Sequence, residues 1–247
     1  MPQTPVTRLD LFTVRPAAVP VSAARMATDR LRLRREPTLR FSKLLGTGDG
    51  RTFDARDADL RRWGVLTVWP TPQEAADFAR RTGPLRGWRR SATEHWWVTL
   101  RPLRTRGAWS GRQPFGAGSA DHPAHEPVAA GSADHPAHVP IAALTRARLR
   151  WSRAARFWQA VAPVNADLAA REGLLLRMGI GEAPVGMQGT FSLWRDAEAL
   201  RAFAYAALPH RDVIRRSHDE RWYAEELFAR FAIRDHGGTI FGADPLG

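Results

Sequence analysis

Eight short, largely apolar runs along the chain have strand character, and residues 9–15 and 142–150 also alternate apolar with polar positions, as half-buried β-strands do. These runs cover residues 9–15, 39–48, 63–69, 95–103, 142–150, 174–181, 187–194 and 227–233. Residues 21–34 and 152–171 are rich in Ala, Arg and Leu and predict helices. Two further helices are expected after Thr71-Pro72 and Asp196, because a proline in the first turn and an acidic cap favour a helix start. The stretch 222–231 is compatible with strand and, in part, with helix.

Two long segments of the chain align with each other. Residues 68–97 and 193–222 superpose without a gap at an offset of 125, so that Trp69 meets Trp194 and Pro84 meets Pro209. Each half has the order β-α-β-β-α-β, which is the ferredoxin-like unit. The chain is therefore expected to have an α+β fold: two tandem ferredoxin-like (βαββαβ) repeats packed as a dimeric-α/β-barrel type fold, with helices outside and a cavity between the sheets.

A segment dense in Gly, Pro, Ala and His joins the halves, which predicts three parts: a repeat at 1–106, a flexible linker at 107–140 and a repeat at 141–247. The linker contains the word AGSADHPAH twice, at a spacing of thirteen. Its HxxH pairs raise the question of a zinc or nickel site, but a proline inside each pair disfavours the helix that would bring both imidazoles together. We interpret the pattern as a tandem duplication within a linker. It holds four histidines: His122, His125, His135 and His138.

Composition narrows the function classes. A chain of 247 residues can bury a substantial core, and the absence of cysteine excludes disulfides, thiolate metal sites and cysteine nucleophiles. No secretory signal or membrane-length apolar run is visible, so we expect a cytoplasmic protein. The net charge of +12 comes almost entirely from arginine and suits an anionic partner. No nucleic-acid-binding motif accompanies the charge, and an anionic membrane surface fits it equally well.

One histidine differs from the others. His95, His218 and His236 are expected to be structural or exposed. His210 aligns with Leu85 of the first half, so one copy of the scaffold has imidazole where the other has an apolar side chain. Such a position is a candidate for acquired chemistry, although a satisfied core histidine explains it as well.

Several short motifs occur in an order that is specific when taken together. They are GTGDGRTF (46–53), LTVWP (66–70), PIAALTRA (140–147), RFW (156–158), GIGEAP (179–184), QGTFSLW (188–194), ALPHRDVIR (207–215) and WYAEELFARF (222–231). By these motifs the chain resembles the spheroidene monooxygenases, carotenoid ketolases of phototrophic bacteria, over most of its length. It departs from them in the linker, which is longer here by roughly one copy of the thirteen-residue repeat.

The resemblance implies a monooxygenase containing haem b that inserts oxygen at an allylic carbon of an acyclic carotenoid, with two hydroxylations at one carbon leading to a ketone. His210 would be the axial iron ligand, leaving the opposite face open for dioxygen. Ile214, Phe203 and Trp222 would line the pocket. Electrons would come from an external ferredoxin or reductase, because GTGDG (46–50) lacks the third glycine and the setting of a dinucleotide site.

Strand alternation suggests which residues face the open side of the iron. In 187–194, Gln188, Thr190 and Ser192 share one face and are candidate catalytic residues of a distal pocket. An equal alternative is that this stripe faces helices or solvent.

Two other functions stay open at this level. One is a haem enzyme of another reaction type, a dehydratase or peroxidase, on the same barrel. The other is a non-enzymatic basic module that binds nucleic acid or anionic lipid. Peripheral membrane contact and a homodimer are compatible with the sequence, and no specific nucleic acid is expected.

Overall fold

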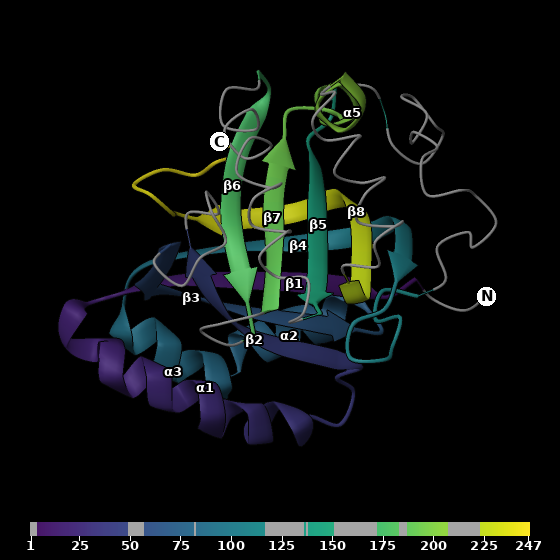
Figure 1. Cartoon of the computed structure of the whole chain (residues 1–247). Helices are drawn as coiled ribbons and strands as arrows, with labels where there is room; N and C mark the ends of the chain where they lie inside the picture. The colour runs from purple at the N-terminus through teal and green to yellow at the C-terminus, as the bar shows by residue number, and fades with distance from the viewer. Residues whose placement is uncertain are drawn as a thin grey trace.

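The computed structural model describes residues 4–48, 57–81, 83–116, 136, 138–150, 172–182, 187–206 and 223–247 (Figure 1). The first half contains β1 (Val6–Val14), a short 3-10 helix (Pro16–Ala18), α1 (Val19–Arg34), β2 (Phe41–Gly48), β3 (Ala58–Trp69), α2 (Pro72–Arg80), α3 (Pro84–Ser91) and β4 (Ala92–Gly107). The second half contains β5 (Ile141–Leu149), β6 (Leu174–Gly181), β7 (Met187–Trp194), α5 (Ala197–Ala206) and β8 (Tyr223–Gly238).

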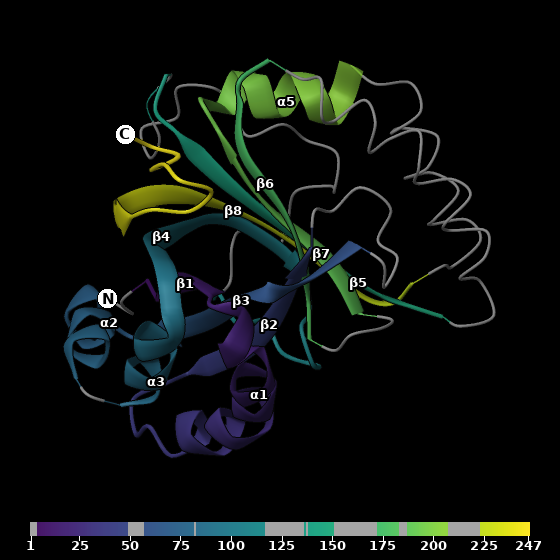
Figure 2. The ribbon, with the colours of Figure 1, turned by 90° about the vertical axis from the view of Figure 1, so that its left-hand side faces the viewer.

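The eight strands form one closed barrel in the order β1-β3-β2-β6-β7-β5-β8-β4, and all pairings are antiparallel. Each half contributes four neighbouring strands. Helices α1, α2 and α3 cover the outside of the first half, whereas α5 lies on the far side of the barrel (Figure 2). The predicted fold is confirmed.

Helix starts agree with the capping signals in the sequence. The Thr71 hydroxyl accepts a hydrogen bond from the Glu74 amide at 3.2 Å, and Asp196 accepts one from the Ala199 amide at 2.8 Å. The first of these helices, α2, ends at Arg80. A separate helix, α3, starts at Pro84, a proline in its first turn.

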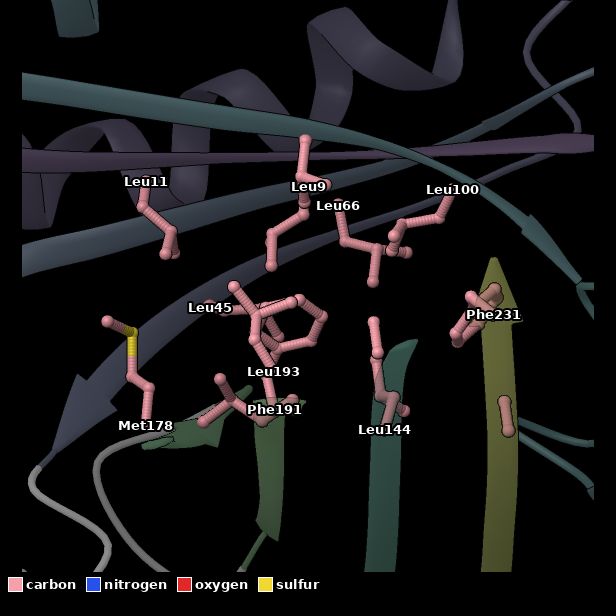
Figure 3. Packing of buried hydrophobic residues seen from close by; sticks show 14 of the residues in the cluster. Leu9, Leu11, Leu45, Leu66, Leu100, Leu144, Met178, Phe191, Leu193 and Phe231 are labelled. Carbon is pink, nitrogen blue, oxygen red and sulfur yellow. The ribbon is translucent and has the colours of Figure 1, made fainter. Parts of the chain in front are cut away.

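Large apolar side chains fill the barrel interior. Alternate residues of each strand point inward, and they meet between the four strands of the first half and the four strands of the second half, which we call the first and the second sheet (Figure 3). Among them are Leu9, Leu66, Leu144, Phe191 and Phe231. The expectation of a cavity between the sheets is therefore wrong for the described residues. Burial of these side chains, at about 25 cal/mol per Å² of apolar surface, stabilises the barrel instead of leaving room for a ligand.

The two halves join along two seams. One is the long pairing of β4 with β8, and the other is the short pairing of β2 with β6. In the short seam Gly46 faces Gly181 and Gly48 faces Gly179, so the two Gly-x-Gly segments are neighbours in space. A Cβ on Gly48 would lie 2.6 Å from the carbonyl oxygen of Asp57, which explains the need for glycine there.

Two similar turns follow the last strand of each half. GAWSGRQPFG (107–116) and GTIFGADPLG (238–247) share the spacing of their glycines and proline. Ser110 and Phe241 both have φ of 57°, and each turn is closed by one isolated bridge. Trp109 and Ile240 insert into the barrel core. Residues 107–116, within the predicted linker, are thus an ordered turn, and the rest of the three-part division stays a prediction.

Buried charges hold the first turn against the barrel. Glu225 accepts hydrogen bonds from the Ser110 and Gly111 amides at 3.0 and 2.7 Å and pairs with Arg146, which is 4% exposed. Burial alone would raise the pKa of Glu225, but these hydrogen bonds and the Arg146 charge lower it below its usual value. Glu182 bridges Arg146, Lys43 and the Trp109 indole.

The structure also tests the expectations for His95 and for residues 223–231. His95 lies in β4, as the strand expected over 95–103 predicts. The chain is strand from Tyr223 to Gly238, which excludes the helical alternative for 223–231. The helix expected over 152–171 lies outside the described residues. Among the helices that the structure describes, none is long and apolar enough to cross a bilayer.

Candidate functional site

The strand registers allow the helix-facing sides of the two halves to be compared position by position. Val6 of β1 pairs with Trp69 of β3, and Ile141 of β5 pairs with Trp194 of β7. Because Trp69 and Trp194 are equivalent in the sequence alignment, β1 and β5 correspond at an offset of 135. The outward residues of the two sheets can therefore be matched one to one.

Aromatic rings fill the helix-facing side of the first half. Phe12 and Trp63 are cross-strand partners, and their ring centroids lie 6.0 and 6.1 Å from that of Trp88 on α3. Leu44 and Leu85 belong to the same buried cluster, and Leu85 is only 1% exposed. This side is a packed layer between sheet and helices.

The matching positions of the second half carry small or polar residues. Phe12 corresponds to Ala147 and Trp63 to Gln188, which are again cross-strand partners. Leu44, which faces Val65, corresponds to Gly179, which faces Thr190. The sheet is the same, but the side chains that fill the first layer are replaced by shorter ones.

Hydroxyl groups occupy the centre of this second face. Thr145 and Thr190 are cross-strand partners and are both half-buried. Ser192 is buried, and its Oγ accepts a hydrogen bond from Trp194 Nε1 at 3.0 Å. The second face therefore presents hydroxyl donors at the positions of Val65 and Asp10, whereas Thr67 in the first half and Ser192 in the second are both hydroxyl residues.

The second face also has defined edges. Phe203 on α5 stacks on Trp194 with ring centroids 5.3 Å apart, as Phe78 packs on Trp69 at 4.8 Å in the first half. In the row of Ser192, the register places Arg177 on one side and Arg230 on the other. The face is thus bounded by an aromatic pair at one end and by cations at its flanks.

A buried ionic cluster lies in the first half, where the matching positions of Arg8 and Asp10 in the second half are Ala143 and Thr145. Arg8 Nε donates to Asp10 Oδ2 at 2.8 Å, and His95 Nε2 lies 2.8 Å from Asp10 Oδ1. Burial would raise the pKa of Asp10, but the hydrogen bonds and charges of His95 and Arg8 lower it overall. His95 also stacks on Phe12 at 4.4 Å. These contacts make His95 part of the first packed layer.

Comparison with known proteins shows where this chain belongs. A spheroidene monooxygenase of Rhodobacter capsulatus is 34% identical over 243 residues, covering 98% of this chain and 95% of the relative. One of Rubrivivax gelatinosus is 35% identical over 199 residues, covering 79% of this chain and 69% of the relative. The chain belongs to the spheroidene monooxygenase family. As a member of this family it is a monooxygenase, and thus an oxidoreductase.

The solved structures agree on the fold of this spheroidene monooxygenase family member. An aldoxime dehydratase covers 94% of the chain with a TM-score of 0.57 at 12% identity. A second aldoxime dehydratase structure, in complex with butyraldoxime, has the same TM-score at 10% identity. At such identities the likeness concerns the barrel fold alone. No protein-family model matches the chain.

The structure brings some of the predicted site residues together. Thr190 and Ser192 share the helix-facing side of β7, while Phe191 and Leu193 point into the barrel. The predicted alternation is therefore confirmed, and of the two alternatives the stripe faces outward, toward the helix side. Gln188 shares this face by its backbone register. The catalytic role of these three residues stays a prediction.

The remaining predicted residues divide into two groups. Phe203 is described, and its contact with Trp194 repeats the Phe78–Trp69 pair, so packing alone accounts for it. His210, Ile214 and Trp222 lie outside the described residues.

The other histidines are placed in part. Of the linker histidines only His138 is described, and it is exposed. His236 Nδ1 lies 3.0 Å from Asp244 Oδ2, in the second turn, and His218 lies outside the described residues. Across the part of the chain that the structure describes, no three His, Asp or Glu side chains are grouped to hold a metal ion.

Sequence reasoning missed Thr145, Ala147 and Gly179 on the second face. The sequence signal is the replacement of aromatic and aliphatic residues in the first repeat by small residues in the second. This replacement could be recognised at Thr145 and Ala147 only once the correspondence of β1 with β5 was known, because β1 and β5 correspond at an offset of 135 and the alignment has an offset of 125.

Proposed function

We propose that this protein is a haem-dependent monooxygenase that inserts oxygen at an allylic carbon of an acyclic carotenoid. Its family relatives are named for activity on spheroidene. The observation that carries the proposal is the second helix-facing side, where Ala147 and Gly179 replace Phe12 and Leu44. Without the large side chains of Phe and Leu at these positions, the flat macrocycle of haem could lie over the strands.

The residues present fit haem b. The face offers a small, partly apolar floor at Ala143, Ala147 and Gly179, with Arg177 and Arg230 at its flanks as candidate partners for propionates. His210 follows the last residue of α5 by four positions. Its first-half equivalent, Leu85, points into the layer between helix and sheet. An imidazole in that orientation would face the second sheet and could ligate iron.

The chain's own groups would bind and orient the substrate. Apolar surface of the layer would bury a polyene, at about 25 cal/mol per Å² removed from water, and exclude water from the reacting carbon. Ser192 Oγ already accepts from Trp194, so its hydroxyl proton is left to be donated toward the face. The Thr145 and Thr190 hydroxyls lie on neighbouring strands and could hydrogen-bond a polar oxygen there.

Haem, when bound, would supply the activation of dioxygen. Each hydroxylation consumes one dioxygen, two electrons and two protons and releases one water, so an external ferredoxin or reductase is required. Two hydroxylations at one carbon give a geminal diol, which loses water to form a ketone. Peripheral contact with a membrane would give the protein access to its apolar substrate. We also propose that the protein can form a homodimer.

The cofactor is tested by spectroscopy on protein purified from haem-supplemented cells. We expect a Soret band in the wild type, its loss in His210→Ala, and its retention in His236→Ala, which alters a histidine of β8. A ferrous-CO spectrum then identifies imidazole ligation. Colourless wild-type protein, or a His210→Ala variant that keeps the band unchanged, contradicts the proposal.

The substrate is tested by supplying an acyclic carotenoid with a reductase and ferredoxin. We expect a ketone by mass spectrometry, with the hydroxylated carotenoid as an earlier product. Failure to oxidise any acyclic carotenoid, in protein that contains haem, would contradict the substrate but not the cofactor.

A further inference from the structure

A shallow hollow of about 360 Å³ lies where α2 ends and α3 runs past it. Every side chain that lines it is an arginine: Arg80, Arg81, Arg86, Arg89 and Arg90. We call this feature the arginine hollow. Guanidinium groups stay charged at any physiological pH, so the hollow gathers five permanent positive charges.

Only some of these charges are balanced within the protein. Arg80 pairs with Asp77, and Arg81 lies 3.5 Å from a Glu36 oxygen. Arg89 donates to the Ala79 carbonyl oxygen at 2.7 Å, which orients it without neutralising it. The Arg86 and Arg90 side chains have no acceptor within the described part of the chain, and both residues are exposed.

More positive charge surrounds the end of α3. Arg15 donates to the Arg90 carbonyl oxygen at 3.0 Å, and Arg25 donates to the Ser91 hydroxyl at 2.8 Å. Like charges held this close repel one another, and an anion placed among them removes that repulsion.

We infer that the arginine hollow binds a phosphate-bearing anion. Arginine recognises phosphate oxygens through two parallel N–H···O bonds, and such charge-assisted bonds are stronger than neutral ones. The volume of the hollow, about 360 Å³, leaves room for a phosphate group.

This site is separate from the candidate oxygenation site. Helices α2 and α3 lie against the first half, whereas α5 and the second face lie on the other side of the barrel (Figure 2). The inference therefore does not rest on haem or on the carotenoid substrate. The phosphate could belong to a soluble metabolite or to the headgroup of an anionic lipid, and the experiment distinguishes these sources.

The test uses the full chain and two matched double variants. Arg86→Gln/Arg90→Gln removes the two unpaired cations of the hollow. Arg30→Gln/Arg34→Gln removes two exposed cations from α1, which do not line it. Both variants change the net charge equally, so a difference between them reports the hollow and not general attraction to a protein of net charge +12.

Binding of inorganic pyrophosphate is measured by isothermal titration calorimetry at fixed ionic strength. Co-sedimentation is measured with phosphatidylcholine vesicles with and without phosphatidylglycerol. We expect the hollow variant to bind the anion at least about tenfold more weakly, and the α1 variant to stay within about twofold of wild type.

Each outcome decides the inference. Selective loss of pyrophosphate binding supports a soluble phosphate ligand. Selective loss of binding to phosphatidylglycerol vesicles, without pyrophosphate binding, supports a lipid headgroup. Equal weakening in both variants, or no binding of either probe by the wild type, overturns the inference.

Discussion

The helix-facing sides of the two sheets share one backbone plan and have opposite contents. In the first half, Phe12 and Trp63 pack under Trp88, and Asp10 is held between Arg8 and His95. In the second half, the same register positions hold Ala147, Gln188 and Thr145. The packed layer of the first half contributes to stability, whereas the described part of the second face carries smaller side chains at the matching positions.

This difference shows how a duplicated scaffold can divide its tasks. Side chains from both halves of the chain fill the barrel interior. One outer layer can then lose its large side chains without loss of the barrel. Function is thus expected on the outside of the second half of the barrel. Substitutions should lower stability on the first side and should change ligand binding on the second.

The largest effect is expected at Phe12. Phe12→Ala removes a ring from a packed aromatic layer and should lower the free energy of unfolding by about 4 kcal/mol. Urea denaturation measures this, with Ala147→Ser, at the matching position, as a control that should change stability by less than about 0.5 kcal/mol. A cost below about 1 kcal/mol for Phe12→Ala would show that the first layer is not well packed.

The ionic cluster should come next. Asp10→Asn leaves the buried Arg8 without its carboxylate and should cost about 3 kcal/mol at neutral pH. Thr145→Val, at the matching position, should cost less than about 1 kcal/mol.

The same variant predicts a pH dependence. Because the folded-state pKa of Asp10 lies below its unfolded value, its ionisation stabilises the protein above about pH 4 and ceases to do so as the pH falls through the folded value. The stability difference between wild type and Asp10→Asn should therefore shrink on acidification. A difference that grows toward low pH would reverse the sign of the argument.

Refilling the second layer should reduce cofactor binding. Ala147→Phe restores the ring of the first half and is expected to lower haem uptake by about tenfold or more, while the barrel still folds. The Soret absorbance per protein and a thermal melt measure the two effects separately, and Ala147→Ser again serves as the control. Normal haem content in Ala147→Phe would place the cofactor elsewhere.

The smallest effect is expected at Ser192. Trp194 Nε1 donates to Ser192, whereas Trp69 Nε1 has no partner among the described residues. Ser192→Ala would make the second half resemble the first in this respect and should cost about 1 kcal/mol in stability. Differential scanning calorimetry measures the change, and Ser192→Thr, which keeps the hydroxyl, should recover most of it.

Local patterns predicted much of the fold because they depend on neighbouring residues. The strand expected over 187–194 and the helix start at Asp196 are both found. The start of α2 at Pro72 is predicted from the sequence, but a separate helix at Pro84, where α3 begins, is not. The similarity of the turns at 107–116 and 238–247 was not predicted, because residues 107–116 lie in the segment that the sequence analysis assigns to the linker.

The candidate site was predicted in its residue types and not in its location. Alternation grouped Thr190 with Ser192 correctly, but alternation is symmetric between the two faces of a strand and cannot say which one meets the barrel core. Gly179 and Thr145 could not be recognised, because each is significant only beside a partner on another strand.

The sequence by itself determined the duplication, the strand alternation, the helix caps and the single position where imidazole faces leucine in the alignment, since all of these are local or repeat-level properties. Tertiary structure decided that the barrel interior is filled, that the hydroxyl stripe faces outward and that five arginines share one hollow. The reason is physical: closure of the barrel and packing of helices on sheets bring together residues that are distant in the chain, and only such contacts determine whether a layer is full or open.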